Sequence, residues 1–209
     1  MKNKLLLVII FLGVIAGVAI GHSFAHKKTQ PSKQVLGTQT IAQKEIAPTT
    51  SPTSSEPVAP GVPEKISIPK INVNTTVESV GMDSEGRMDI PKDPADTAWF
   101  SPGYKPGMNG SAVIDGHLDL VTGAPAVFWN LKLLSAGDNI SVTENNGKTY
   151  TFAVTQTVRY PYNSFPIKEV FAASDVPMLN LITCNGTWDK TTKNYSDRLV
   201  VYSKLVSIN

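Results

Sequence analysis

The first part of the chain divides by hydropathy into a continuous apolar run and a polar stretch. Residues 5–20 form sixteen consecutive positions without a polar side chain, and two lysines lie just before them. With the mixed residues up to Ala25, the run reaches the roughly twenty residues that a membrane-spanning helix needs. The pattern predicts a cytoplasmic tip over residues 1–4 and an uncleaved, single-pass signal anchor over residues 5–25.

A cleavable signal peptide is the alternative to this anchor. Ser23-Phe24-Ala25 resembles the small-x-small site at which signal peptides are cut. The anchor is favoured because the apolar run lies at the upper limit of a signal-peptide core. Lys27 and Lys28 on the far flank weaken the charge rule for orientation, so the orientation depends partly on what the rest of the chain does.

The next stretch, residues 26–64, has the composition of a spacer. It contains six prolines and a core rich in Thr and Ser, and its apolar residues follow no helical or strand period. A segment of this kind cannot bury enough apolar surface to fold. We expect an extended, disordered linker that holds a folded domain, residues 65–209, away from the membrane.

The folded domain shows mainly the pattern of β-strands. Short segments rich in Val, Ile, Thr and aromatic residues alternate with turn signals, and the Asn-Gly pair at residues 146–147 favours a tight hairpin turn. The expected strands cover residues 66–68, 76–80, 111–114, 139–144, 148–158, 178–183 and 198–206. Two short helices are expected over residues 126–134 and 167–173. Many short strands with few helices predict a closed barrel or a sandwich.

Three acidic residues, Asp83, Glu85 and Asp89, could be taken for a calcium-binding loop. Their spacing lacks the terminal bidentate Glu and the full set of oxygen ligands of an EF-hand. We therefore interpret residues 83–86 as a solvated turn. No metal ion or other cofactor is expected anywhere in the chain.

The charge distribution separates the two parts of the chain. Residues 1–64 carry six Lys against three Glu, a net charge of +3, and residues 65–209 carry thirteen Lys and Arg against fourteen Asp and Glu, a net charge of −1. Without a basic excess the domain is not a general nucleic-acid binder. The single cysteine of the chain excludes an intramolecular disulfide framework and any multi-cysteine metal site.

Candidate chemistry centres on that cysteine and on the only histidine after residue 26. His117 follows the strand expected at 111–114, and Cys184 follows the strand expected at 178–183. A thiol becomes a strong nucleophile as thiolate, commonly with a neighbouring imidazole. From these two residues alone, a small buried Cys remains the more common situation.

A cation extends the constellation. Arg198 begins the last expected strand, and a fixed guanidinium beside the thiol could donate hydrogen bonds to a developing oxyanion. The alternative for Arg198 is a strand-end salt bridge with Asp189 or Asp197.

These three residues lie in motifs that resemble those of the sortases, the membrane-anchored cysteine transpeptidases of Gram-positive-type cell envelopes. The motifs are Gly116-His117, the segment 181–184 (Leu-Ile-Thr-Cys) and the segment 197–201 (Asp-Arg-Leu-Val-Val). Connecting segments at 88–94, 98–113, 124–134 and 137–138 are similar to sortases of class F and the related class E. Asn180 departs from the Thr that often begins the cysteine motif of the family.

The resemblance implies an eight-stranded β-barrel with a cleft that holds His117, Cys184 and Arg198. It implies that Cys184 attacks the Thr carbonyl of an LPXTG-like sorting signal in a surface protein and forms an acyl-thioester. An amine of a cell-wall precursor or of a pilin would then release the product. His117 would transfer protons, and Arg198 would bind the substrate backbone and the oxyanion. The catalytic domain would lie on the extracellular face of the cell membrane.

Two alternatives are weaker on the residues themselves. L,D-transpeptidases are also external β-rich cysteine enzymes, but they carry His and Cys close together in sequence, whereas here sixty-seven positions separate the two. A catalytically inactive sortase-like binding domain would be expected to lack one of the three residues, and all three are present. The sequence therefore favours an active transpeptidase.

Overall fold

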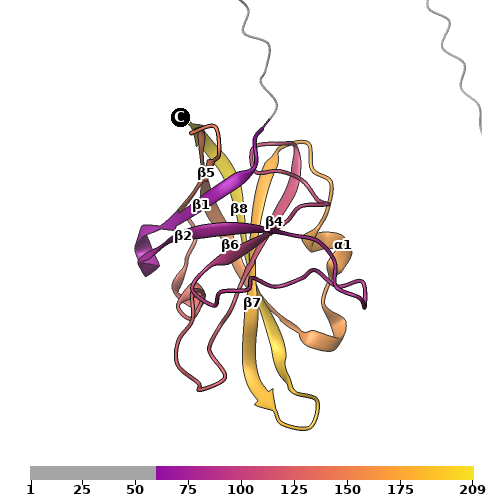
Figure 1. Ribbon diagram of the computed structural model, residues 1–209. Helices are drawn as coiled ribbons and strands as arrows, with labels where there is room; N and C mark the ends of the chain where they lie inside the picture. Colours follow the sequence, from indigo (N-terminus) through magenta and orange to yellow (C-terminus); the bar gives the residue numbers. More distant parts are fainter. Residues whose placement is uncertain (1–59) are drawn as a thin grey trace, which may run out of the picture. The chain divides into compact units, whose positions relative to one another are not determined.

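The structure is a computed structural model, and it describes residues 60–209. These residues form a closed barrel of eight strands with the order β1-β2-β3-β4-β7-β8-β6-β5 (Figure 1). The strands are β1 (Pro63–Ile68), β2 (Val73–Val80), β3 (Thr97–Phe100), β4 (Gly110–Gly116), β5 (Asn139–Glu144), β6 (Thr149–Pro161), β7 (Pro177–Asp189) and β8 (Asn194–Ile208). The predicted eight-stranded barrel is confirmed. The predicted tip, anchor and nearly all of the predicted linker lie outside the described residues.

The helical elements of the described residues are short. They are three 3₁₀ turns, η1 (Pro69–Ile71), η2 (Leu131–Leu133) and η3 (Tyr162–Ser164), and one helix, α1 (Ile167–Val170). Among residues 60–209, no helix is long and apolar enough to cross a membrane.

Two strand pairs are parallel, so the barrel is not a simple antiparallel meander. β2 pairs with β3 in parallel, and β4 pairs with β7 in parallel, while the other neighbours are antiparallel. The connections between parallel strands cross from one end of the barrel to the other. The connection from β6 to β7 carries η3 and α1, which lie against the outside of the barrel (Figure 1).

The interior of the barrel is apolar and closely packed. Alternate residues of every strand point inward, as the period of two requires. The interior cluster contains residues from all eight strands and from the η2 region, including Ile66, Val77, Trp99, Ile114, Phe128, Leu131, Val142, Phe152, Leu181 and Val201, each at most 5% exposed. This packing fixes the register on which the outer face depends.

A second apolar cluster lies on the outer face of β4, β7 and β8. It consists of the five buried residues Val113, Val170, Ile182, Val200 and Tyr202. Partly buried side chains from other strands and from loops pack against these five. Because Val170 belongs to α1, this cluster attaches the β6–β7 connection to the sheet. Asn180 strengthens the attachment, since its Nδ2 donates a hydrogen bond of 2.6 Å to the Val170 carbonyl.

The predicted hairpin and turn are present. The hairpin β5–β6 turns at Asn145–Gly147, where Gly147 has φ +83° and Asn146 does not reach positive φ. In the predicted turn at residues 83–86, the Asp83 carboxylate accepts hydrogen bonds from the amides of Glu85 and Arg87 and pairs with the Arg87 guanidinium. The acidic side chain is thus used within the turn.

The helix predicted over residues 126–134 is wrong in extent, because only Leu131–Leu133 form a 3₁₀ turn. The amide of Val127 donates to the carbonyl of Pro94, and the amide of Phe128 donates to the carbonyl of His117. These bonds fix the start of the segment to its neighbours. Further along, the amides of Leu131 and Leu134 bond to carbonyls three residues back, as in a 3₁₀ turn and not an α-helix. The helix predicted over 167–173 is confirmed in its first turn only.

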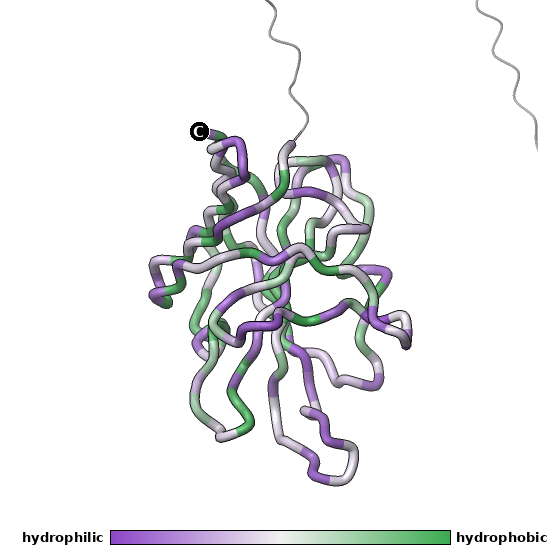
Figure 2. Tube along the Cα trace, in the orientation of Figure 1, coloured by the Kyte–Doolittle hydropathy of each residue, from purple (hydrophilic) through white to green (hydrophobic). Residues whose placement is uncertain are grey.

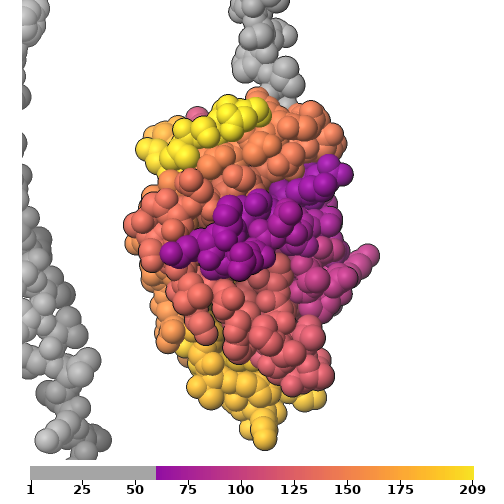
Figure 3. Space-filling view, turned by 90° about the vertical axis from the view of Figure 1, so that its left-hand side faces the viewer, coloured from indigo at the N-terminus to yellow at the C-terminus, as the bar shows by residue number. Residues whose placement is uncertain are grey.

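Sequence patterns also missed two features of the sheet. β3 is only four residues long, and no separate strand was expected there. β7 and β8 continue beyond the predicted ends to Asp189 and from Asn194, and they form a hairpin that extends past the barrel (Figure 1). Figure 2 shows this extension as mainly polar, which is why its residues carried no strand signal. In Figure 3 its tip forms one end of the domain.

Candidate active site

Cys184 and Arg198 lie directly opposite each other in the antiparallel pair β7–β8. Residues opposite each other in such a pair point to the same face, with Cβ atoms about 4.5–5.5 Å apart. Leu181 and Val201 belong to the interior cluster, and Ile182 and Val200 to the outer one. Alternation therefore places Cys184 and Arg198 on the outer face of two neighbouring strands.

His117 reaches the same place from β4. In the parallel pair β4–β7, Asp115 lies beside Ile182, and β4 ends at Gly116, directly before His117. The Thr183 hydroxyl donates a 2.7 Å hydrogen bond to the Gly116 carbonyl and fixes this register next to the site. The Nε2 atom of His117 lies 3.2 Å from the Pro91 carbonyl oxygen, which orients the ring.

Gly116 has a packing reason for its place before His117. A Cβ atom on this residue would lie 2.5 Å from the Phe128 ring, which is completely buried. The Phe128 amide also donates a 2.9 Å hydrogen bond to the His117 carbonyl. A residue with a side chain at position 116 would displace the ring that supports the histidine backbone.

The guanidinium of Arg198 is held by neutral groups. Its Nη1 donates to the carbonyls of Asp197 (3.0 Å) and Tyr195 (3.4 Å), and its Nη2 donates to Asn194 Oδ1 (2.9 Å). Its Cζ lies 4.8 Å from the centre of the Tyr162 ring. Both ion pairs found within residues 60–209 belong to Arg87. The alternative of a salt bridge from Arg198 to Asp189 or Asp197 is therefore wrong. The Arg198 guanidinium has no ion-pair partner among residues 60–209.

The thiol of Cys184 is half-buried. Burial raises its pKa, and the positive charge of Arg198 opposes this effect in part. The carboxylates of Asp115 and Asp119 raise the pKa further. The resting site thus favours the thiol over the thiolate.

Sequence reasoning missed two acidic residues and a tyrosine beside the three predicted ones. Burial raises the pKa of Asp115 to about 6, although the charges of His117 and Arg198 act in the opposite direction. The Tyr195 hydroxyl donates a short hydrogen bond to Asp119 Oδ2, and this bond is the main reason that the pKa of Tyr195 rises to about 12. The available signal for Asp115 was its position two residues before His117, on the same face of a strand.

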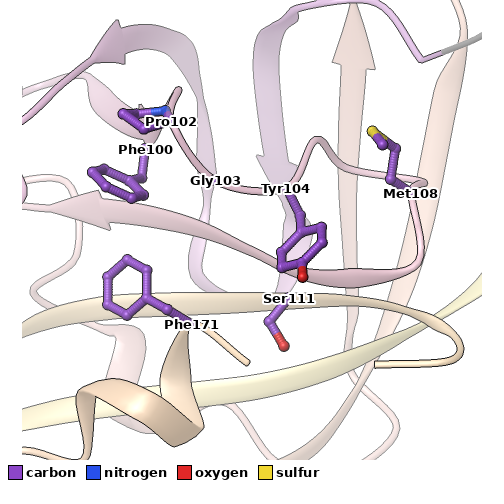
Figure 4. A pocket seen from close by; sticks show the side chains of 7 residues that line it. All are labelled: Phe100, Pro102, Gly103, Tyr104, Met108, Ser111 and Phe171. Atoms are coloured by element: carbon purple, nitrogen blue, oxygen red, sulfur yellow. The ribbon is translucent and has the colours of Figure 1, made fainter. Parts of the chain in front are cut away.

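An apolar pocket of about 510 Å³ lies farther along the outer face. Figure 4 shows the rings of Phe100 and Phe171 on one side of it and the Tyr104 hydroxyl pointing toward Ser111. The two phenylalanine rings meet edge to face at 5.3 Å. Ser111 lies six residues before His117 on β4, so the pocket is about 20 Å from the histidine along the strand.

Residues 60–209 contain no group of three or more His, Cys, Asp or Glu side chains arranged to hold a metal ion.

Comparison with models of known protein families shows to which family this chain belongs. The family model described as the Sortase domain matches residues 66–206, about two thirds of the chain. The chain belongs to the sortase family. Family membership and fold together support a transpeptidase activity.

Solved sortase structures share the fold at low sequence identity. Sortase A of Listeria monocytogenes is 19% identical, with a TM-score of 0.54 over 72% of this chain and 90% of that one. Sortase C1 of Streptococcus agalactiae is 22% identical, with a TM-score of 0.54 over 69% and 67%. A lid mutant of sortase A from Corynebacterium diphtheriae is 24% identical, with a TM-score of 0.54 over 71% and 72%. A search of curated proteins gives no match.

Proposed function

We propose that this sortase is a membrane-anchored cysteine transpeptidase that acts outside the cell on surface proteins carrying an LPXTG-like sorting signal. The observation that supports this proposal best is the register of three strands. It sets Cys184 opposite Arg198 on the outer face of the barrel, and His117 directly follows β4, the strand beside β7. The predicted anchor and linker would hold this face near the membrane, where surface proteins emerge.

The first half of the reaction is acylation. The Cys184 thiolate attacks the carbonyl carbon of the Thr in the sorting signal, and a sulfur–carbon bond forms. The N–H groups of Arg198 donate to the oxyanion as the carbonyl oxygen gains charge. The carbon–nitrogen bond then breaks, the leaving amine takes a proton from the His117 imidazolium, and an acyl-thioester remains on Cys184.

The second half is transfer. A neutral amine of a cell-wall precursor or a pilin attacks the thioester carbonyl, and His117 accepts the proton that the amine loses. The carbon–sulfur bond breaks, the Cys184 thiolate leaves, and a new amide joins the surface protein to its acceptor. Because burial keeps most of the thiol protonated, we expect a slow enzyme at neutral pH.

A peptide assay with the full chain in detergent micelles tests this function. Peptides from an LPXTG-like library are incubated with the enzyme and an amine acceptor, and mass spectrometry follows both the thioester adduct and the transferred product. An adduct on Cys184 followed by an amide product supports the proposal. Binding of peptides without any adduct would support the alternative, an inactive sortase-like extracellular binding domain.

A further inference from the structure

Asp115 is the one acidic residue of β4. Val113 of this strand belongs to the outer apolar cluster, and the strand period of two places Asp115 on the same outer face, two residues before His117. The register places Asp115 between Ala98 of β3 and Ile182 of β7, both of them buried. A carboxylate at this position costs free energy unless nearby positive charge compensates it.

The charged groups around Asp115 are those of the site. His117 in its charged form and Arg198 stabilise the carboxylate, and the carboxylate in turn destabilises a thiolate on Cys184. The other carboxylate that acts on Cys184, Asp119, is hydrogen-bonded to the Tyr195 hydroxyl.

One further carboxylate lies on a neighbouring strand. Glu78 of β2 pairs with Ala98, and its Oε1 accepts hydrogen bonds from the amides of Lys92 and Asp93. The Asp115 carboxylate accepts a hydrogen bond from the Gly116 amide. Of these carboxylates, Asp115 and Asp119 act on Cys184, and the effect of Asp115 is the larger.

We propose that Asp115 is a positioning residue whose negative charge, together with burial, keeps Cys184 in the thiol form in the resting enzyme. The inference rests on the proposed function, in which Cys184 is the nucleophile. Asp115 acts through its charge alone. It needs no contact with the substrate, and it forms and breaks no bond.

Alkylation of the thiol measures this effect directly, because Cys184 is the only cysteine of the chain. The rate of reaction with iodoacetamide is measured from pH 5 to pH 10 for the full chain in detergent. The variant Asp115→Asn should react roughly three to ten times faster than wild type at pH 7, since more of its thiol is ionised. The midpoint of its rate–pH curve should move to lower pH.

Two further variants separate charge from other effects. Asp115→Glu keeps the charge and should retain the wild-type midpoint, and Asp175→Asn removes one exposed charge beyond α1 and should leave the curve unchanged. A wild-type midpoint in folded Asp115→Asn would overturn the proposal. If Asp115→Asn fails to fold, as shown by tryptophan fluorescence, Asp115→Ser provides a second neutral variant for the same measurement.

The outcome is independent of the peptide assay. If the midpoint moves but wild type forms no thioester with any peptide, the charge effect stands and the proposed function fails. If wild type cleaves peptide but the midpoint stays in place for both neutral variants, the function stands and the role of Asp115 is wrong.

Discussion

The inner and outer faces of strands β4, β7 and β8 differ in burial and in the polarity of their side chains. On the inner face, Ile114, Leu181 and Val201 are fully buried and belong to the interior cluster. On the outer face, one residue away along the same strands, Asp115 and Cys184 are half-buried in a mixed polar and apolar surface. A one-residue slip of the strand register would exchange the two faces. The packing of the inner face therefore keeps the site residues on the outer face, although the core residues take no part in the reaction.

Replacing the outer-face nucleophile should have the largest effect on function and almost none on the core. Cys184→Ala should form no thioester adduct, because alanine has no nucleophile, while its resistance to urea stays close to that of wild type. Mass spectrometry after incubation with peptide and a fluorescence-monitored urea titration check the two halves of this expectation. An adduct on the alanine variant would remove Cys184 from the mechanism.

Arg198→Lys should be the next most harmful change. Lysine keeps the charge but loses the planar fork of donors that can hold two acceptors. If Arg198 stabilises the oxyanion, kcat should fall by roughly 10²–10³-fold. If it only positions the substrate, KM should rise with kcat nearly unchanged. Full activity in a folded Arg198→Lys variant would show that the guanidinium of Arg198 is not needed, and the site would then consist of the Cys–His pair alone.

On the inner face, Leu181→Ala should reduce stability and leave the chemistry of the folded fraction in place. Truncation of a buried leucine costs about 2–5 kcal/mol, depending on how far the cavity collapses. Val206→Ala removes an exposed apolar side chain and serves as the control, with an expected change below about 0.5 kcal/mol. Urea unfolding followed by tryptophan fluorescence measures both. A loss below about 1 kcal/mol in Leu181→Ala would mean that the two faces are less distinct than their burial indicates.

A neutral residue at position 115 should make the outer face more stable at neutral pH. The folded state holds the Asp115 proton up to a pKa of about 6, whereas an unfolded Asp loses it near 3.8. Between these values the folded state binds more protons, so the free energy of unfolding falls as the pH rises. Asp115→Asn should therefore gain about 3 kcal/mol at pH 7 and almost nothing at pH 3.5. An equal gain at both pH values would point to packing as the cause.

Tyr195→Phe should have the smallest effect. The change removes the hydrogen bond to Asp119 but keeps the ring that packs edge to face on Trp188 at 5.2 Å. We expect a loss of about 1 kcal/mol of stability and a change in kcat/KM of no more than a few fold. Thermal unfolding and peptide kinetics measure these values. A loss of kcat/KM above tenfold, without unfolding, would give the hydroxyl a part in the reaction itself.

The sequence predicted those parts of the fold in which local pattern and tertiary context agree. Alternation located most strands, and the order of Gly116-His117, Cys184 and Arg198 along the chain indicated the candidate site. The segment expected to be a helix over 126–134 has only a 3₁₀ turn, with amides bonded to carbonyls three residues back, and its start is tied to the distant carbonyls of Pro94 and His117, which no local pattern reveals. The burial of Asp115 was equally hidden, since it depends on a register between strands sixty-seven positions apart.

The hydrogen bond from Thr183 to the Gly116 carbonyl has a consequence for the kinetics of folding. It closes a loop between residues sixty-seven positions apart, and the parallel pairing of β4 with β7 depends on the same closure. Contacts of this range form slowly, because the chain loses much of its entropy before any of them contributes. A newly made chain therefore has no assembled site while the barrel is open, and catalytic competence should appear only in the last, cooperative step of folding.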